Sequence, residues 1–192
     1  MKTWRIRCVC ALWLWANSAF AHELQGNRLT LVMREPKHIT LTFLIDYIDV
    51  LKRALSPQSS EQEFAVTCAS MTPVAFQKAL LQAQQKFQAD SKVILSGGKQ
   101  ARISHWQWPA PKVVQARLQE LVMQALVAPA AHGHSEAFEV RAEIKSTHPL
   151  LAIRLALPEE FRPTTIVSYR PTQVLLQPKA AASSITFSAP PP

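Results

Sequence analysis

A strict alternation of apolar and charged residues towards the C-terminal end constrains the fold more than any other feature of this chain. Between Phe138 and Lys145 every second residue is apolar, and every residue in between is charged. Successive side chains of a β-strand point to opposite faces, so the pattern predicts a strand with one buried and one exposed face. Strands of this kind are typical of antiparallel sheets.

Similar alternation elsewhere predicts further strands, arranged as hairpins. Residues 27–34 and 38–47 are expected to pair across a short turn at Glu35-Pro36-Lys37. A second hairpin is expected across Gly97-Gly98, because glycine accommodates the positive φ of a tight hairpin turn. The expected partners are 93–96 with 100–108, 138–145 with 151–157, and 164–169 with 173–176.

Three segments carry helix signals. Thr72 offers a capping hydroxyl and Pro73 suits the first helical position, so a helix is expected from here to about residue 89. Its apolar stripe consists of Phe76, Leu80, Ala83 and Phe87. The other expected helices are a short one over residues 46–55 and a long amphipathic one over residues 112–127. Residues 64–70 are ambiguous, and we expect a strand there.

The order of these elements indicates the fold class. Strands and helices do not alternate regularly, which argues against a doubly wound parallel sheet. We therefore expect an α+β fold, in which two long amphipathic helices pack on a largely antiparallel sheet built from several hairpins. A single domain over residues 22–178 is expected, followed by a disordered Ala/Ser/Pro-rich tail over residues 179–192.

Residues 1–21 have the features of a secretory signal peptide. Lys2, Arg5 and Arg7 precede a short apolar stretch over residues 8–16, and Ala19-Phe20-Ala21 supplies the small-x-small pattern of a cleavage site. We expect a periplasmic or secreted protein that begins at His22. The remaining chain has no run approaching the roughly 18 apolar residues of a membrane helix, so no membrane span is expected after signal removal.

The charge distribution argues against a nucleic-acid partner. The formal net charge is +8, and removal of the three positive charges in the signal leaves +5. The lysines and arginines are scattered, with Lys52-Arg53 as the densest spot, whereas nucleic-acid-binding proteins gather basic residues into a patch. The expected partner is instead a protein of the cell envelope.

Cysteine content excludes an internal disulfide framework. Cys8 and Cys10 leave with the signal, so Cys68 is the single cysteine of the expected mature chain. Its apolar neighbours Phe64, Val66 and Met71 favour a buried residue. A reactive thiol and half of an intermolecular bridge are the alternatives.

Three histidines are candidate metal ligands. An N-terminal His22 would offer its α-amino and ring nitrogens to one ion, and Gly133 would let His132 and His134 bend towards a shared ion. Nitrogen ligands of this kind suit copper or zinc. The arrangement resembles, at the level of the motif, exported copper proteins whose mature chains begin with histidine, including copper chaperones and lytic polysaccharide monooxygenases. The resemblance implies copper handling.

Other candidate sites have simpler interpretations. Trp106 and Trp108 would share one strand face, either as part of the core, which we favour, or as a sugar-stacking platform. Asp46 and Asp49 would share a helix face, but Asp46 is expected to cap that helix and Asp49 to face solvent. The chain lacks a Gly-x-Ser-x-Gly elbow, a His-Glu-x-x-His helix and a glycine-rich phosphate loop, so no enzyme class is indicated.

These observations predict an exported, non-catalytic accessory or binding protein. The alternative is a copper- or zinc-handling protein that uses His22 and the loop containing His132 and His134.

Overall fold

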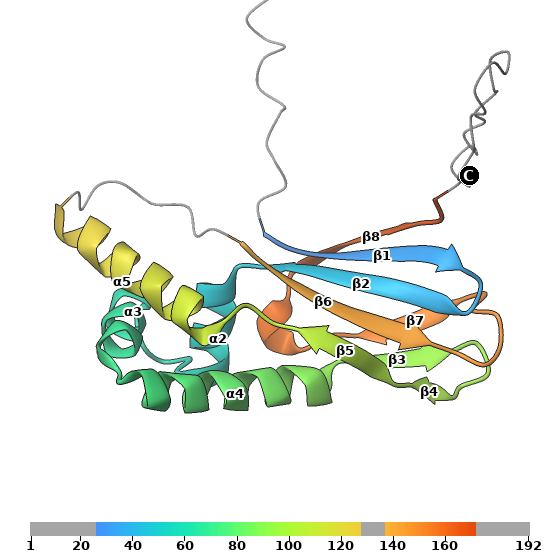
Figure 1. Ribbon diagram of the computed structural model, residues 1–192, viewed down its shortest axis with the longest axis horizontal. Coiled ribbons are helices and arrows are strands. Elements are labelled where there is room, and N and C mark those ends of the chain that lie inside the picture. The colour runs from blue at the N-terminus through green and yellow to red at the C-terminus, as the bar shows by residue number, and fades with distance from the viewer. Residues whose placement is uncertain (1–25, 128–136, 172–192) are drawn as a thin grey trace, which may run out of the picture.

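The computed structural model describes residues 26–127 and 137–171. Within them the chain forms two β-sheets and a group of helices (Figure 1). The strands are β1 (Asn27–Glu35), β2 (His38–Ile45), β3 (Lys92–Leu95), β4 (Gln100–Ala101), β5 (Ile103–Gln107), β6 (Phe138–Lys145), β7 (Ile153–Ala156) and β8 (Thr164–Tyr169). The helices are α2 (Tyr47–Leu55), α3 (Glu61–Ser70), α4 (Pro73–Asp90), α5 (Pro111–Val127) and the short 3-10 helix η1 (Glu159–Phe161).

The larger sheet has five strands in the order β5-β6-β2-β1-β8, and the smaller has three in the order β4-β3-β7. Neighbouring strands are antiparallel except for β1 and β8, which run parallel. This arrangement confirms the expected α+β fold with largely antiparallel sheet.

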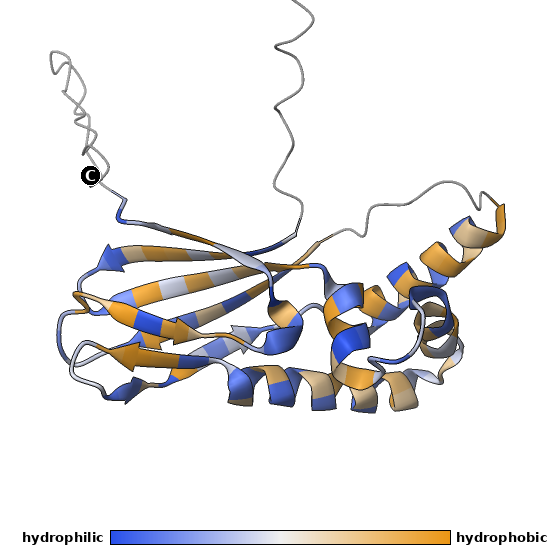
Figure 2. Ribbon diagram, turned by 180° about the vertical axis from the view of Figure 1, so that it is seen from behind, coloured by the Kyte–Doolittle hydropathy of each residue, from blue (hydrophilic) through white to orange (hydrophobic). Residues whose placement is uncertain are grey.

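The two faces of the five-stranded sheet differ as the alternation predicts. Leu29 of β1 lies opposite Phe43 of β2, which in turn lies opposite Val140 of β6, and all three side chains are buried. The residues between them place arginine, threonine and glutamate on the outer face. Apolar and polar residues therefore alternate along these strands, as Figure 2 shows from behind.

The helices gather at one end of the sheets, and α4 runs along the side away from β1 and β8 (Figure 1). Phe87 of α4 and Phe161 of η1 meet Phe43 of β2, with ring centroids 5.6 Å and 5.8 Å from that of Phe43. The core therefore lies between the inner face of the five-stranded sheet and the helices.

The helix predictions for residues 46–55, 72–89 and 112–127 are confirmed. Asp46 caps α2 by accepting a hydrogen bond from the Asp49 backbone N–H at 3.3 Å, and Thr72 caps α4, which begins at Pro73. Within the described part of the chain, no helix combines the length and the apolar character that a membrane span requires.

The strand expected over residues 64–70 is wrong, because this segment belongs to α3. Ser60 and Glu63 form a capping box: the Ser60 hydroxyl accepts from the Glu63 N–H at 3.2 Å, and the Glu63 carboxylate accepts from the Ser60 N–H at 2.8 Å. The buried residues of α3 are Phe64, Ala65 and Cys68, a helical spacing that the short apolar run does not distinguish from a strand.

The expected hairpin of residues 138–145 with 151–157 is also wrong. β6 lies between β2 and β5 and does not pair with β7, which pairs with β3 in the smaller sheet. β8 pairs with β1, and the expected pairing of residues 164–169 with 173–176 stays a prediction because residues 173–176 lie outside the described residues. Alternation identifies the buried face of a strand but does not identify its neighbour, which is decided by contacts distant in sequence.

The hairpin across Gly97-Gly98 is confirmed only in its first part. β3 and β4 pair as expected, and Gly98 has a φ of 79°. The chain then leaves the smaller sheet, and β5 joins β6 instead. His105 has a positive φ of 53° where the pairing of β5 shifts register between Ser104 and Gln107, which marks a bulge.

Candidate functional site

The predicted metal ligands His22, His132 and His134 lie outside the described residues, so copper or zinc handling stays a prediction. Within residues 26–127 and 137–171, no three side chains of His, Cys, Asp and Glu form a group suited to a metal ion.

The tryptophan pair belongs to the core, as favoured from the sequence. The Trp106 and Trp108 rings stack with centroids 5.6 Å apart, and Trp106 also stacks on Phe43 at 5.5 Å. Both side chains are partly buried and packed against the core cluster. The bulge at His105 leaves them on the inner face of the sheet, so they do not form an exposed sugar-stacking platform.

Cys68 is buried at 2 % exposure, and burial raises the pKa of its thiol. A buried thiol with a raised pKa is a poor nucleophile, so this cysteine is structural.

Asp46 and Asp49 do not form a free carboxylate pair: Asp46 caps α2, and Asp49 makes an ion pair with Arg53 one turn further along the helix. Asp49 keeps a surface position, as expected from the sequence, with 34 % of its side chain exposed.

β8 stands out as a free edge of the five-stranded sheet. It follows β1 over six residue pairs, from Asn27–Thr164 to Val32–Tyr169, and no described strand lies on its other side. All residues from Thr165 to Tyr169 are exposed, including Ile166 at 51 %. An edge strand presents unpaired backbone N–H and C=O groups, which form a template for pairing with another strand.

The sequence of β8 contains no residue of the kinds that commonly prevent pairing at a sheet edge. Proteins commonly protect edge strands with lysine, proline or inward-pointing charges. Thr164–Tyr169 contains none of these and consists of Thr, Ile, Val, Ser and Tyr, which suit a β-strand. The edge is therefore chemically open as well as sterically exposed.

A groove lined largely by apolar side chains runs beside this edge. It lies between the inner face of the larger sheet and the segment that leads into β7, it is open to solvent, and its volume is about 480 Å³. The lining residues are Leu31, Met33, Ile39, Leu150, Leu151, Ala152, Ile153, Ser168, Tyr169 and Arg170. Because Ser168 and Tyr169 belong to β8, a strand added to β8 would lie next to the groove.

Charge near β8 is predominantly positive. Arg162 and Arg170 flank the strand, Arg28 lies beside Thr165 on the neighbouring strand, and all three arginines are exposed. At β6, further across the outer face, charges are balanced locally: Glu143 lies 3.0 Å from Lys145, and Arg141 pairs with Glu139. Lys145 holds the pKa of Glu143 below its ordinary value.

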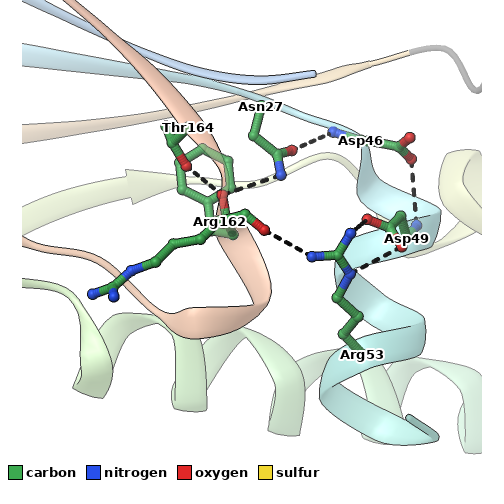
Figure 3. Close-up of polar contacts among 7 residues, drawn as sticks. Asn27, Asp46, Asp49, Arg53, Arg162 and Thr164 are labelled. Atoms are coloured by element: carbon green, nitrogen blue, oxygen red, sulfur yellow. Dashed lines mark hydrogen bonds and ion pairs between the residues drawn. The ribbon is translucent and has the colours of Figure 1, made fainter. Parts of the chain in front are cut away.

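A network of polar contacts fixes the start of β8 (Figure 3). The Asn27 side chain donates to the Phe161 carbonyl oxygen at 3.2 Å and accepts from the Asp46 backbone N–H at 2.9 Å. The Thr164 hydroxyl donates to the same carbonyl oxygen, and Arg53 donates to the Arg162 carbonyl oxygen at 2.8 Å. These contacts join β1, α2 and the chain between η1 and β8, so they hold the start of β8 in place against β1 and α2.

Comparison with protein-family models, curated proteins and solved structures finds no match to this chain. The sequence expectation for residues 164–169 named only the following segment as their partner, so it did not point to the β8 edge. The available signal was the uncharged, β-prone run over residues 164–169, which Pro163 precedes and Pro171 follows after Arg170, since proline near a strand is typical of sheet edges.

Proposed function

We propose that this is an exported, non-catalytic binding protein of the cell envelope, which takes up an extended segment of a partner protein at the edge of β8. The observation that supports this proposal is the exposure of β8 from Thr165 to Tyr169, on an edge without charge or proline. Addition of a strand to such an edge is a recurrent mode of peptide recognition.

Backbone hydrogen bonds to β8 would supply affinity, and side chains would supply selectivity. Every second side chain of the added strand would face the groove that Leu31, Ile39 and Ile153 line. These positions favour apolar side chains in the partner. The arginines around β8 favour acidic residues near the ends of the segment, because opposite charges speed encounter and disfavour wrong partners.

Export is tested by isolating the full-length gene product from the periplasmic fraction or the medium and sequencing its N-terminus. A chain that begins at His22 supports the proposal. A chain that retains residues 1–21 and stays in the cytoplasm would overturn it.

The binding site is tested by photo-crosslinking in the host cell. A photoreactive amino acid at Ser168 should give a discrete adduct with another protein, and the same group at Gln82, an exposed position on α4, should not. The absence of an adduct at Ser168 contradicts the proposal. An adduct of the protein with itself would also contradict it, because it would show that a second copy occupies the edge.

A matched pair of substitutions separates strand addition from general surface contact. Ile166→Lys places a charge on the open edge and should abolish the Ser168 adduct. Val66→Lys changes a similarly exposed apolar residue on α3, 46 % against 51 %, and should leave the adduct unchanged. Equal effects of the two substitutions would refute recognition at β8. Unchanged thermal unfolding temperatures would show that both variants are folded.

A further inference from the structure

One face of α5 holds this helix to the rest of the molecule. Val114 and Leu118 are buried on this inner face. Gln115 lies between them and donates a hydrogen bond to the Met71 carbonyl oxygen, at the end of α3, at 2.8 Å. The inner face of α5 therefore packs on α3 and the core, while the C-terminal end of the helix projects beyond the other helices (Figure 1).

The opposite face of α5 carries a second stripe of largely apolar residues, here called the outer stripe. It consists of Val113, Ala116, Glu120, Met123 and Val127. These positions recur three and four residues apart, which is the spacing at which one helix packs against another. All five are exposed, Met123 at 60 % and Val127 at 81 %. Apolar residues on two opposite faces are typical of a helix that is covered on both sides.

An open groove of about 540 Å³ lies beside the first half of the outer stripe. Val113 and Ala116 line it from α5, and Phe138 lines it from the start of β6. Methionine suits such a groove because its long, flexible side chain fills irregular apolar spaces. The second half of the outer stripe presents a methionine of this kind, Met123.

Two charges near the middle of the outer stripe indicate which kind of helix covers it. Arg117 and Glu120 lie one turn apart, with Arg117 Nη1 2.8 Å from Glu120 Oε2. A second α5 that runs in the opposite direction brings a glutamate to this arginine and an arginine to this glutamate, because in a twofold interface each contact occurs twice. Complementary charges favour this orientation over a parallel one, which would bring like charges together.

We propose that this protein forms a symmetric dimer in which two α5 helices pack antiparallel through their outer stripes. Met123 of each copy fills the groove beside Val113 of the other copy. Glu120 of each copy lies opposite the small Ala116 side chain of the other, which leaves room for it to reach Arg117. The β8 edge lies on a different element, so this proposal and the proposed function can fail independently.

Sedimentation equilibrium of the chain purified from its host measures the association. The mass should rise with concentration from one chain to two and no further, because a twofold interface is closed. Met123→Glu should raise the dissociation constant about tenfold or more, since the substitution acts twice in the dimer. Leu126→Glu adds the same charge at a similarly exposed residue off the outer stripe, and it should change the dissociation constant less than about twofold.

An exchange of charges tests the orientation of the helices. Arg117→Glu and Glu120→Arg should each weaken the dimer, because each brings like charges together across the interface. The two substitutions combined should restore it, since they re-create the opposite pairs with their signs reversed. Failure of the combined variant to restore the dimer, with its fold intact, would overturn the antiparallel arrangement.

Disulfide formation tests the register. Val113→Cys combined with Met123→Cys should give a covalent dimer on oxidation with diamide, because facing Cα atoms lie within the roughly 7 Å that a disulfide spans. Either substitution alone should not, because equal positions of the two antiparallel helices lie about 15 Å apart along the axis. Cys68 is buried and does not compete.

A mass of one chain at every concentration up to about 1 mM would overturn the proposal and would leave the outer stripe to a different partner. Equal effects of Met123→Glu and Leu126→Glu would also overturn it, as would equal yields of covalent dimer from the double and single cysteine variants. Thermal unfolding of each variant shows whether a loss of association reflects a loss of fold. The double cysteine variant adds no charge to α5, so it tests the register even where a charged variant does not fold.

Discussion

Replacement of Asn27 by alanine tests the structural basis of the β8 edge. Asn27 is 6 % exposed, and its side-chain amide makes a buried contact with the Phe161 carbonyl oxygen at 3.2 Å and a part-buried contact with the Asp46 N–H at 2.9 Å. The contact with Phe161 joins residues 134 positions apart in sequence. Asn27→Ala removes both contacts at once and leaves no side chain to replace them.

The expected loss of stability depends on which hydrogen bonds the Phe161 carbonyl oxygen and the Asp46 N–H keep in the variant. The Phe161 carbonyl oxygen still accepts from the Thr164 hydroxyl, so it loses only one of two hydrogen bonds. The Asp46 N–H loses the acceptor that Asn27 supplied, in a part-buried position. A net hydrogen bond contributes about 1 kcal/mol and an unsatisfied buried donor costs about 1–3 kcal/mol, so the free energy of unfolding should fall by about 2–4 kcal/mol.

Equilibrium urea unfolding of the wild type and the variant measures this change. The dependence of the free energy of unfolding on urea concentration should stay the same, because the surface exposed on unfolding is unchanged. Gln119→Ala is the control, since it removes a single exposed contact with the Ala69 carbonyl oxygen and should cost less than about 1 kcal/mol. Equal losses in the two variants, or a loss below about 0.5 kcal/mol for Asn27→Ala, would refute the reasoning.

Three further predictions concern ionisable groups. Burial raises the pKa of Tyr47 to about 12. The contribution of Tyr47 to the free energy of unfolding should therefore be constant up to about pH 10 and should fall as the pH rises to about 12, because the unfolded phenol ionises first. Tyr47→Phe should remove this fall, and an unchanged alkaline profile would contradict the burial of the hydroxyl. In the native protein, the buried Cys68 should react with a thiol reagent only as fast as the whole protein unfolds, and in urea it should react rapidly. Fast reaction of the native protein would contradict the burial of this thiol. Hydrogen bonds from the Ser60 N–H and hydroxyl lower the pKa of Glu63, so the capping box should stabilise α3 above the ordinary carboxyl pKa and lose its effect as the pH falls through the lowered value. Glu63→Gln should reduce the fall in the free energy of unfolding at acidic pH. An unchanged fall in this variant would contradict a stabilising role of the capping box.

Much of the fold could be predicted because the spacing of apolar residues shows which face of each helix or strand is buried. The alternation from Phe138 to Lys145 identified the buried side of β6, and Thr72-Pro73 identified the start of α4. Strand partners could not be predicted in the same way. β6 joins β2 and β5 because its apolar face completes the core over Phe43, a contact between residues far apart in sequence.

α3 was mistaken for a strand for a related reason. A short apolar run fits the spacing of a helix as well as that of a strand. The decisive signal is the pair of hydrogen bonds between Ser60 and Glu63 just before this run, which form a capping box. The serine and the glutamate were both visible in the sequence, three positions apart as a capping box requires.

The candidate site was the least predictable part. An edge is a property of the whole sheet, so the residues of Thr164–Tyr169 cannot by themselves indicate that β8 has one neighbouring strand, β1, among the described residues. The histidine cluster proposed from the sequence concerns His22, His132 and His134, and it is tested by copper titration of the exported protein. Unchanged copper affinity after His22→Ala would exclude a terminal chelate.

Amide hydrogen exchange along β8 tests the central claim most directly. In a strand paired on one side only, alternate amides face the neighbouring strand and the others face outward. In the free, full-length exported protein, the amides of residues 164–169 that face β1 should exchange slowly and those in between should exchange rapidly. Uniform slow exchange over these residues would contradict the account, because it would show that the edge of β8 is already covered.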